Sequence, residues 1–109
     1  MITINDVALY IGIDYYQGDE MVTANLQRAV ASAPYRLHST VGRDVEELMP
    51  GDPRIEELLL MYAEESYDNR QGGSAKQDAA KRHLRDTYEE ELRLELRRAR
   101  EEAAGGGSA

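Results

Sequence analysis

The acidic side chains between residues 52 and 70 are the first candidates for chemistry in this chain of 109 residues. Glu57, Glu64, Glu65 and Asp68 share one face of a predicted helix, and paired carboxylates are the groups that general acid–base catalysis uses. The alternative is a solvated helix face that carries the same residues. We favour the solvated face, because no second catalytic residue type accompanies these carboxylates in the sequence.

Other residue types with catalytic or metal-binding chemistry are isolated. His38 and His83 each flank an apolar stripe of a predicted helix, which is typical of a surface or boundary histidine. Asp14, Asp19 and Glu20 lack the ligand spacing of a calcium loop. A Gly-rich phosphate loop and a nucleophile elbow are absent, and a chain without cysteine forms no disulfide or thiolate metal site. The sequence therefore predicts no catalytic, cofactor-binding or metal-binding residue and no enzyme.

The net charge of −8 is concentrated in the first two thirds of the chain. Residues 1–75 hold five arginines against thirteen acids, whereas residues 76–109 hold eight basic and eight acidic side chains. Sequence-independent binding to nucleic acid needs clustered Lys and Arg, so an acidic body argues against it. Because no apolar run reaches a membrane span and no signal-peptide pattern precedes the body, we expect a soluble protein without membrane contact, made in the cytoplasm.

The segment 52–70 is the predicted centre of the fold. Asp52 is a good helix cap, and Pro53 suits the first helical position because its missing N–H costs nothing there. The run 58–63 is the most apolar of the chain, and with its neighbours it covers roughly 200° of the helix surface. One neighbouring helix cannot cover so wide an arc, so we expect contacts on at least two sides.

Short helical elements flank this centre. Residues 3–6 fit a capping box with Asp6 in place of the usual Glu or Gln, and they predict a helix over 4–11 that ends at Gly12. A loop is expected after it, and residues 44–48 are expected to form a single turn.

A long second helix is predicted to begin after Asp19. Its apolar stripe runs at three- and four-residue spacing from residue 22 to residue 41, where Gly42 is a plausible stop. Pro34 interrupts this stripe without changing its phase. The sequence therefore allows either one kinked helix or two collinear halves, with Ser32 capping the second.

The C-terminal third predicts a helix from residue 75 to about residue 104, roughly 45 Å long, which would project beyond a compact body. Its steps run mostly by four, so a self-pairing coiled coil is disfavoured. We expect this C-terminal helix to bind a partner. Leu94 points away from its main stripe. The candidate partner-binding residues are Leu84, Tyr88, Leu92, Leu94, Leu96 and Ala99.

These elements define an all-α chain with a short N-terminal helix, a long kinked helix, a central buried helix and a long projecting C-terminal helix. We assign residues 1–71 to a helical body, residues 72–104 to a C-terminal docking helix and residues 105–109 to a disordered tail.

Three short segments of the body resemble a known family. They are Tyr10-Ile11-Gly12-Ile13-Asp14, Val41-Gly42-Arg43 and Tyr67-Asp68-Asn69-Arg70. Their order and spacing over residues 2–70 are similar to those of the small helical head–tail connector, or adaptor, proteins of tailed bacteriophages. The chain departs from that family at Pro34 and in its long charged C-terminal helix.

The resemblance implies a non-enzymatic ring, typically of twelve copies, at the head–tail neck of a virion. One face of the ring would dock on the portal protein, and the other would receive a neck, stopper or tail-completion protein. DNA would pass through the hole without specific binding, which suits an acidic body. The protein would be made in the cytoplasm of the bacterial host. Within the body, we expect Tyr67, Asn69 and Arg70 to hold the end of the central helix against the corner at Gly42 and Arg43.

Two other classes of function stay open at this point. The first is a small acidic interaction or scaffolding protein outside any virion, which binds one partner through its C-terminal helix. The second is the acid–base enzyme that would use the helix glutamates. The first predicts a monomer or dimer, whereas the adaptor predicts a large ring.

Overall fold

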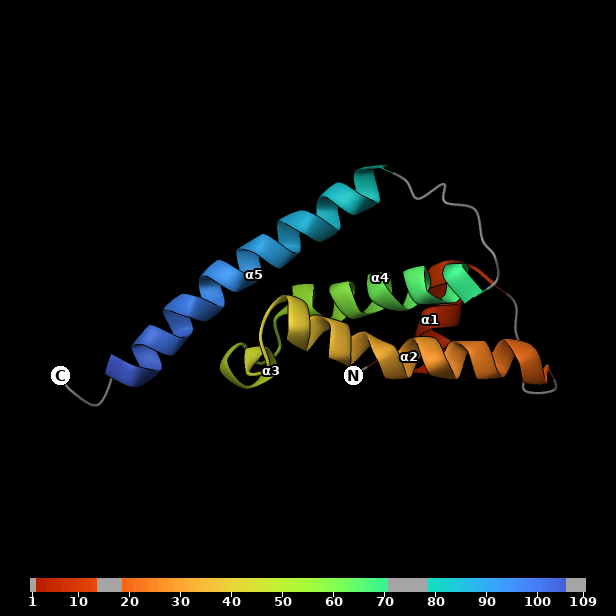
Figure 1. Ribbon diagram of the computed structural model, residues 1–109, viewed down its shortest axis with the longest axis horizontal. Helices are drawn as coiled ribbons and strands as arrows, with labels where there is room; N and C mark the ends of the chain where they lie inside the picture. The colour runs from red at the N-terminus through yellow and green to blue at the C-terminus, as the bar shows by residue number, and fades with distance from the viewer. Residues whose placement is uncertain (1, 14–18, 71–78, 106–109) are drawn as a thin grey trace.

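Five α-helices make up the part of the chain that the structure describes, which confirms the all-α fold (Figure 1). The computed structural model describes residues 2–13, 19–70 and 79–105. The helices are α1 (Ile4–Ile11), α2 (Glu20–Thr40), α3 (Val45–Leu48), α4 (Pro53–Arg70) and α5 (Ala79–Gly105). The predicted loop at 14–18, the break at 71–74 and residues 106–109 of the predicted tail lie outside the described residues. Gly105, which the sequence placed in the disordered tail, is instead the last residue of α5.

The predicted capping residues start the helices. Thr3 Oγ1 accepts a hydrogen bond from the Asp6 N–H over 3.1 Å, and the Asp6 carboxylate accepts one from the Thr3 N–H over 2.9 Å, which confirms the capping box. Asp19 and Asp52 accept hydrogen bonds from the first-turn backbone of α2 and α4. Gly12 closes α1 in the left-handed conformation, with φ of 84°.

α2 continues as one helix through Pro34. The Ser32 hydroxyl donates a hydrogen bond to the Ala29 carbonyl over 3.1 Å, so it does not cap a second helix half and that alternative is wrong. The buried stripe of α2 explains why the proline is tolerated, because apolar contacts with α4 continue on both sides of it. These buried residues are Leu26, Ala29, Ala33 and Leu37.

α4 lies at the centre of the described structure, as its wide apolar arc predicted. α2 runs antiparallel along one side of it and α5 crosses the other side (Figure 1), while α1 contacts both α2 and α4. The buried side chains of α4 are Ile55, Leu58, Leu59, Met61, Tyr62, Ala63 and Tyr67. The expected contacts on two sides of this helix are therefore confirmed.

α5 packs on α3 and α4 and extends beyond them (Figure 1). The radius of gyration is 16.0 Å, which exceeds the ~13 Å of a compact domain of this size. The projecting helix is thus confirmed. Its apolar stripe is nevertheless part of the chain's own core, since Leu92 and Leu96 are 0% and 1% exposed.

Gly42 is the point at which α5 meets the corner that follows α2. A Cβ atom added to Gly42 would lie 2.7 Å from Arg100 Nη2 and closer still to Leu96 Cδ2. α2 ends at Thr40, before this glycine, and the φ of Gly42 is not positive. Gly42 directly follows the C-cap Val41, so the helix stops where the sequence predicted. The glycine is required here because α5 approaches so closely, and not because the backbone is left-handed.

The expected contact between Tyr67 and the corner at Gly42 is not formed. Ser66 Oγ lies 3.5 Å from Ser32 Oγ, and the eight residues from Ser32 to the end of α2 at Thr40 already correspond to roughly 12 Å of helix. The antiparallel course of α2 and α4 therefore places Tyr67 far from that corner, in the body's core. Two further residues of this prediction have side chains outside the described part of the chain: Asn69 and Arg70.

Candidate functional site

The six candidate partner-binding residues of α5 lie on two different faces. Leu92 and Leu96 face the body and are buried, whereas Leu84 and Leu94 are 38% and 48% exposed. Tyr88 packs on the edge of the core, and Ala99 is half-buried. In a single chain, the middle of the predicted partner-binding stripe is therefore already covered, whereas Leu84 and the outer face around Leu94 remain exposed.

A buried polar contact joins α5 to the centre of α4. The Tyr62 hydroxyl donates a hydrogen bond to Glu89 Oε2 over 2.6 Å, and Glu89 is only 7% exposed. The Arg36 guanidinium lies 4.4 Å from the centre of the Tyr62 ring, in a cation–π arrangement. Burial and the hydrogen bond to Glu89 raise the pKa of Tyr62, so the hydroxyl remains a donor to this carboxylate.

Arg54 joins the start of α4 to the middle of α5. Its guanidinium donates to both carboxylate oxygens of Glu95 over 2.7 and 2.8 Å, to Asp52 over 2.6 Å and to Glu91 over 3.2 Å. Bidentate pairing of this kind adds geometric specificity to the attraction of charges. Hydrogen bonds from Arg54 lower the pKa of Asp52 and of Glu95 below their ordinary values.

The candidate catalytic glutamates of α4 form ion pairs between helices. Glu65 Oε1 accepts hydrogen bonds from Arg36 of α2 over 3.2 Å and from Arg85 of α5 over 2.7 Å. Glu64 pairs with Lys81 of α5 over 3.1 Å. These contacts give both carboxylates a structural role, in that they align three helices.

The second half of α5 is tied to the corner after α2. Arg100 donates to both oxygens of Asp44, over 2.8 and 2.5 Å, and these hydrogen bonds lower the pKa of Asp44. Arg93 Nε donates to the Thr40 carbonyl over 2.9 Å. That carbonyl belongs to the last turn of α2 and has no partner further along the helix, so Arg93 caps it.

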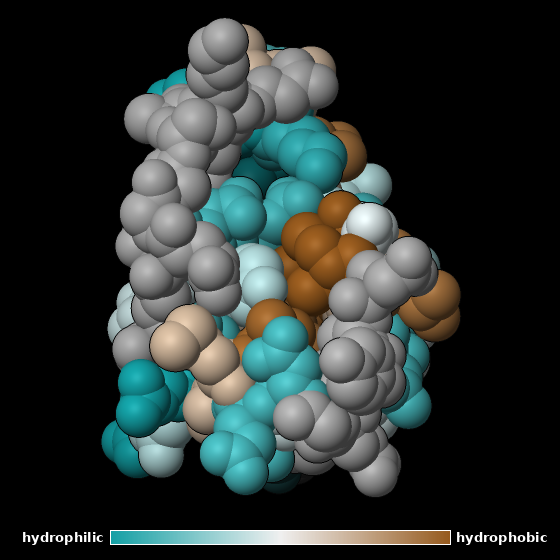
Figure 2. Space-filling model, turned by 90° about the vertical axis from the view of Figure 1, so that its right-hand side faces the viewer, coloured by the Kyte–Doolittle hydropathy of each residue, from teal (hydrophilic) through white to brown (hydrophobic). Residues whose placement is uncertain are grey.

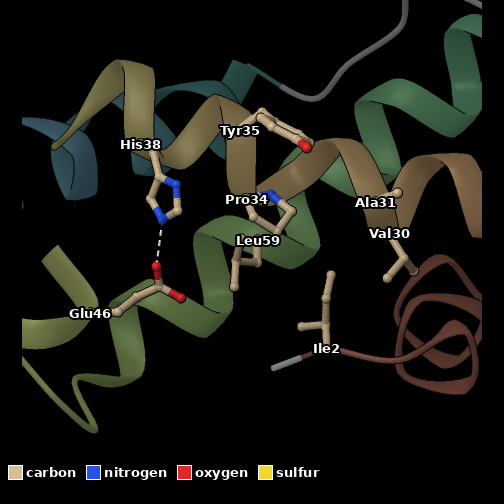
Figure 3. Close-up of a pocket in the computed structure, with 8 residues that line it drawn as sticks. All are labelled: Ile2, Val30, Ala31, Pro34, Tyr35, His38, Glu46 and Leu59. Carbon is tan, nitrogen blue, oxygen red and sulfur yellow. Dashed lines mark hydrogen bonds and ion pairs between the residues drawn. The ribbon is translucent and has the colours of Figure 1, made fainter. Parts of the chain in front are cut away.

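An apolar groove opens on the side of α2 that carries Pro34 (Figure 3). It has a volume of about 450 Å³ and is lined by Ile2, Val30, Ala31, Pro34, Tyr35, His38, Glu46 and Leu59. One end is polar, since His38 Nε2 lies 2.5 Å from Glu46 Oε1. This hydrogen bond to Glu46 is the contact that the structure gives to His38.

Further apolar side chains are exposed on α1 and on α2. Leu9 is 81% exposed, Met21 is 73% exposed and Tyr35 is 79% exposed. Figure 2 looks onto the end of the molecule where α2 begins and α4 ends, and apolar surface lies there between hydrophilic side chains. When exposed apolar surface of this kind is contiguous, it marks a site where other molecules bind.

Within the described ranges, no group of three or more His, Cys, Asp or Glu side chains is placed to hold a metal ion. None of the described helices is long and apolar enough to cross a membrane.

The Arg54 network is the feature that sequence reasoning missed. A signal for it was present, because Glu91 and Glu95 are four residues apart and flank the stripe of Leu92 and Leu96 on one side. Such a pair of carboxylates beside a buried stripe can accept hydrogen bonds from a cation on the helix that the stripe covers, and Arg54 is a basic residue in the first turn of α4.

Comparison with protein family models, with characterised proteins and with solved structures finds no match to this chain.

Proposed function

We propose that this chain is a structural virion protein, a head–tail adaptor that forms a ring beneath the portal. The ring, of about twelve copies by resemblance, joins the DNA-filled head to the neck or tail. One face binds the portal protein and the other binds a stopper or tail-completion protein. DNA passes through the hole, and the protein acts without catalysis or cofactor.

One correspondence carries this proposal. The three segments that resemble the adaptor family each stand at the end of a helix of the body. Tyr10 and Ile11 end α1, Val41 to Arg43 follow α2 directly, and Tyr67 to Arg70 form the last turn of α4. The position of each motif at the end of a helix supports the proposal.

The surface supports the same proposal. Copies arranged head to tail around a closed ring must each present two different patches to their neighbours. Exposed apolar side chains are available on α1, α2 and α5, at Leu9, Met21, Tyr35 and Leu94. The acidic body also suits a channel along which DNA slides.

A second candidate is a small acidic interaction or scaffolding protein outside any virion. Several ion pairs that hold α5 on the body are half-exposed, such as Lys81 with Glu64 and Arg100 with Asp44. Exposed ion pairs contribute little net free energy, so a partner with a better surface for α5 would compete with them. This candidate predicts a monomer or dimer that binds one partner through α5.

Mass measurement separates the two candidates. Native mass spectrometry and sedimentation velocity would be run on the purified chain alone and after mixing with the portal of the same phage or prophage. The adaptor proposal expects a ring of about twelve copies on the portal. A chain that remains a monomer or dimer and leaves the portal free would overturn it.

A deletion of residues 75–109 tests the role of α5. We expect portal binding and ring formation to be lost. Because Leu92 and Leu96 belong to the core, circular dichroism must first show that the shortened body keeps its helices. The paired variant Leu84→Glu changes only an exposed position of α5 and is expected to keep the fold. Unchanged assembly of a folded deletion variant would rule out α5 as a docking element.

A further inference from the structure

The groove beside Pro34 has the shape and chemistry of a receptor for an aliphatic side chain. Pro34, Leu59 and Ile2 converge in it from α2, α4 and the segment before α1 (Figure 3). Its volume of about 450 Å³ leaves room for more than one aliphatic side chain. Ala31 and Tyr35 lie at its rim and are exposed, so the groove is open to another molecule.

The polar end of the groove is acidic. Glu46 has a side chain that is 48% exposed. A second hollow continues from it, sharing Glu46 and Leu59 and adding the exposed Glu56. An occupant that matches this surface has an apolar residue followed by positive charge.

α5 carries such a sequence on its outer face. Leu94 is 48% exposed and lies opposite the buried Leu92 and Leu96. Arg97 and Arg98 follow one turn later and are exposed. Arg98 also lies near enough to Glu95 to contribute to the lowered pKa of that carboxyl. A leucine followed by two exposed arginines thus complements an apolar groove followed by two exposed glutamates.

We propose that the groove beside Pro34 receives the outer face of α5 from a second copy of this chain. Leu94 of that copy enters between Pro34 and Leu59, and its Arg97 and Arg98 face Glu46 and Glu56. The groove and Leu94 belong to different elements, so each copy gives one surface and receives the other. Contacts of this heterologous kind close into rings or extend into filaments. The inference deepens the proposed ring and rests on it.

Disulfide trapping tests this contact, because the chain has no cysteine of its own. Ala31→Cys and Leu94→Cys would be made as separate variants, mixed, and oxidised with and without portal. A disulfide forms only when the two Cα atoms come within about 7 Å. We expect the 31–94 dimer to exceed the dimer of a mismatched pair roughly ten-fold, because proximity raises the effective thiol concentration.

The mismatched pair is Ala31→Cys with Leu84→Cys, which places an exposed thiol on the same helix, ten residues earlier. A double variant with both Ala31→Cys and Leu94→Cys is expected to give a ladder of covalent oligomers, as a head-to-tail contact requires. Equal cross-linking of the matched and mismatched pairs would overturn the proposal. A second pair of results would also overturn it: the ring forms on the portal without the 31–94 disulfide, and Ala31→Arg blocks portal binding. The portal, and not a second copy, would then occupy the groove.

Charge reversal gives a second readout. Glu46→Arg is expected to reduce the yield of the 31–94 disulfide, and Arg98→Glu in the other copy is expected to restore it. Absence of any effect of either change would overturn the orientation proposed for Arg97 and Arg98. The outcomes for the two proposals are distinguishable. A portal-bound ring without the 31–94 disulfide overturns this contact alone, whereas a 31–94 oligomer that ignores the portal overturns the adaptor function alone.

Discussion

The Tyr62 hydroxyl and the Glu89 carboxylate meet over 2.6 Å at the contact between α4 and α5, and both residues are buried. The cation paired with Glu89 is more distant, since Arg93 Nη2 lies 3.8 Å from Glu89 Oε1. Tyr62 is thus the donor that satisfies an acidic group taken out of water. A buried acceptor that loses its donor is costly, because water cannot replace the lost partner.

Tyr62→Phe is therefore expected to lower the free energy of unfolding by about 1–3 kcal/mol, since it leaves the Glu89 carboxylate without this donor while keeping the ring. Urea denaturation followed by circular dichroism measures the change. Tyr35→Phe is the matched control, because Tyr35 is 79% exposed and its hydroxyl is replaced by water. Equal stability of the two variants would contradict the stabilising role of the hydrogen bond between Tyr62 and Glu89.

Leucine truncations test which face of α5 belongs to the chain's own core. Leu96→Ala is expected to cost about 2–5 kcal/mol, as a buried leucine does. Leu94→Ala is expected to stay within about 0.5 kcal/mol, as exposed positions do. Thermal unfolding at two protein concentrations provides the measurement. If Leu96→Ala lowers the stability only at high protein concentration, the stripe of Leu92 and Leu96 packs on another copy instead.

Local chemistry explains what the sequence predicted well. Thr3 with Asp6, and Asp19 and Asp52, act on backbone groups within three residues of themselves, so their roles are legible without any knowledge of the fold. The wide apolar arc of α4 likewise requires two neighbours whatever their identity. These features predicted the bounds of α1, α2 and α4 and the central place of α4.

The remaining features depend on contacts between distant parts of the chain. The periodicity of Leu92 and Leu96 shows that a face is covered, but periodicity is the same whether the cover is the same chain or another. The pairing of Arg54 with Glu95 joins positions 41 residues apart. Tyr67 was wrongly placed beside Gly42, because the motif order gives no information on the antiparallel course of the two helices.

The acidic ion-pair partners predict how stability changes with pH. Asp52, Glu95 and Asp44 have pKa values lowered by hydrogen bonds from Arg54 and Arg100. A carboxyl whose pKa is lower in the folded than in the unfolded chain contributes its full stability above its ordinary pKa, which is 3.8 for Asp and 4.5 for Glu. The contribution is lost as the pH falls through the folded value.

The free energy of unfolding is therefore expected to be nearly level between about pH 7 and pH 5.5 and to fall below about pH 4.5. Arg54→Met removes the donor that lowers two of these pKa values, so its curve is expected to fall less steeply. Arg97→Met, which removes a charge from the exposed face of α5, is expected to keep the original slope. Urea titrations at a series of pH values give the comparison, and parallel curves for the two variants would count against the Arg54 network.

Gly42 provides the sharpest test of the packing between α5 and the corner after α2. Gly42→Ala is expected to cost about 1–3 kcal/mol, as overpacking of a filled site does, because the new Cβ meets Leu96 and Arg100. Gly105→Ala is the control, since nothing lies within 4 Å of a Cβ at that position, and it is expected to be neutral or slightly stabilising. Shortening Leu96 makes room, so Gly42→Ala combined with Leu96→Ala is expected to cost less than the two single changes together, by about 0.5–3 kcal/mol. A double-mutant cycle from urea denaturation measures this coupling, and strict additivity would mean that Leu96 does not lie over Gly42.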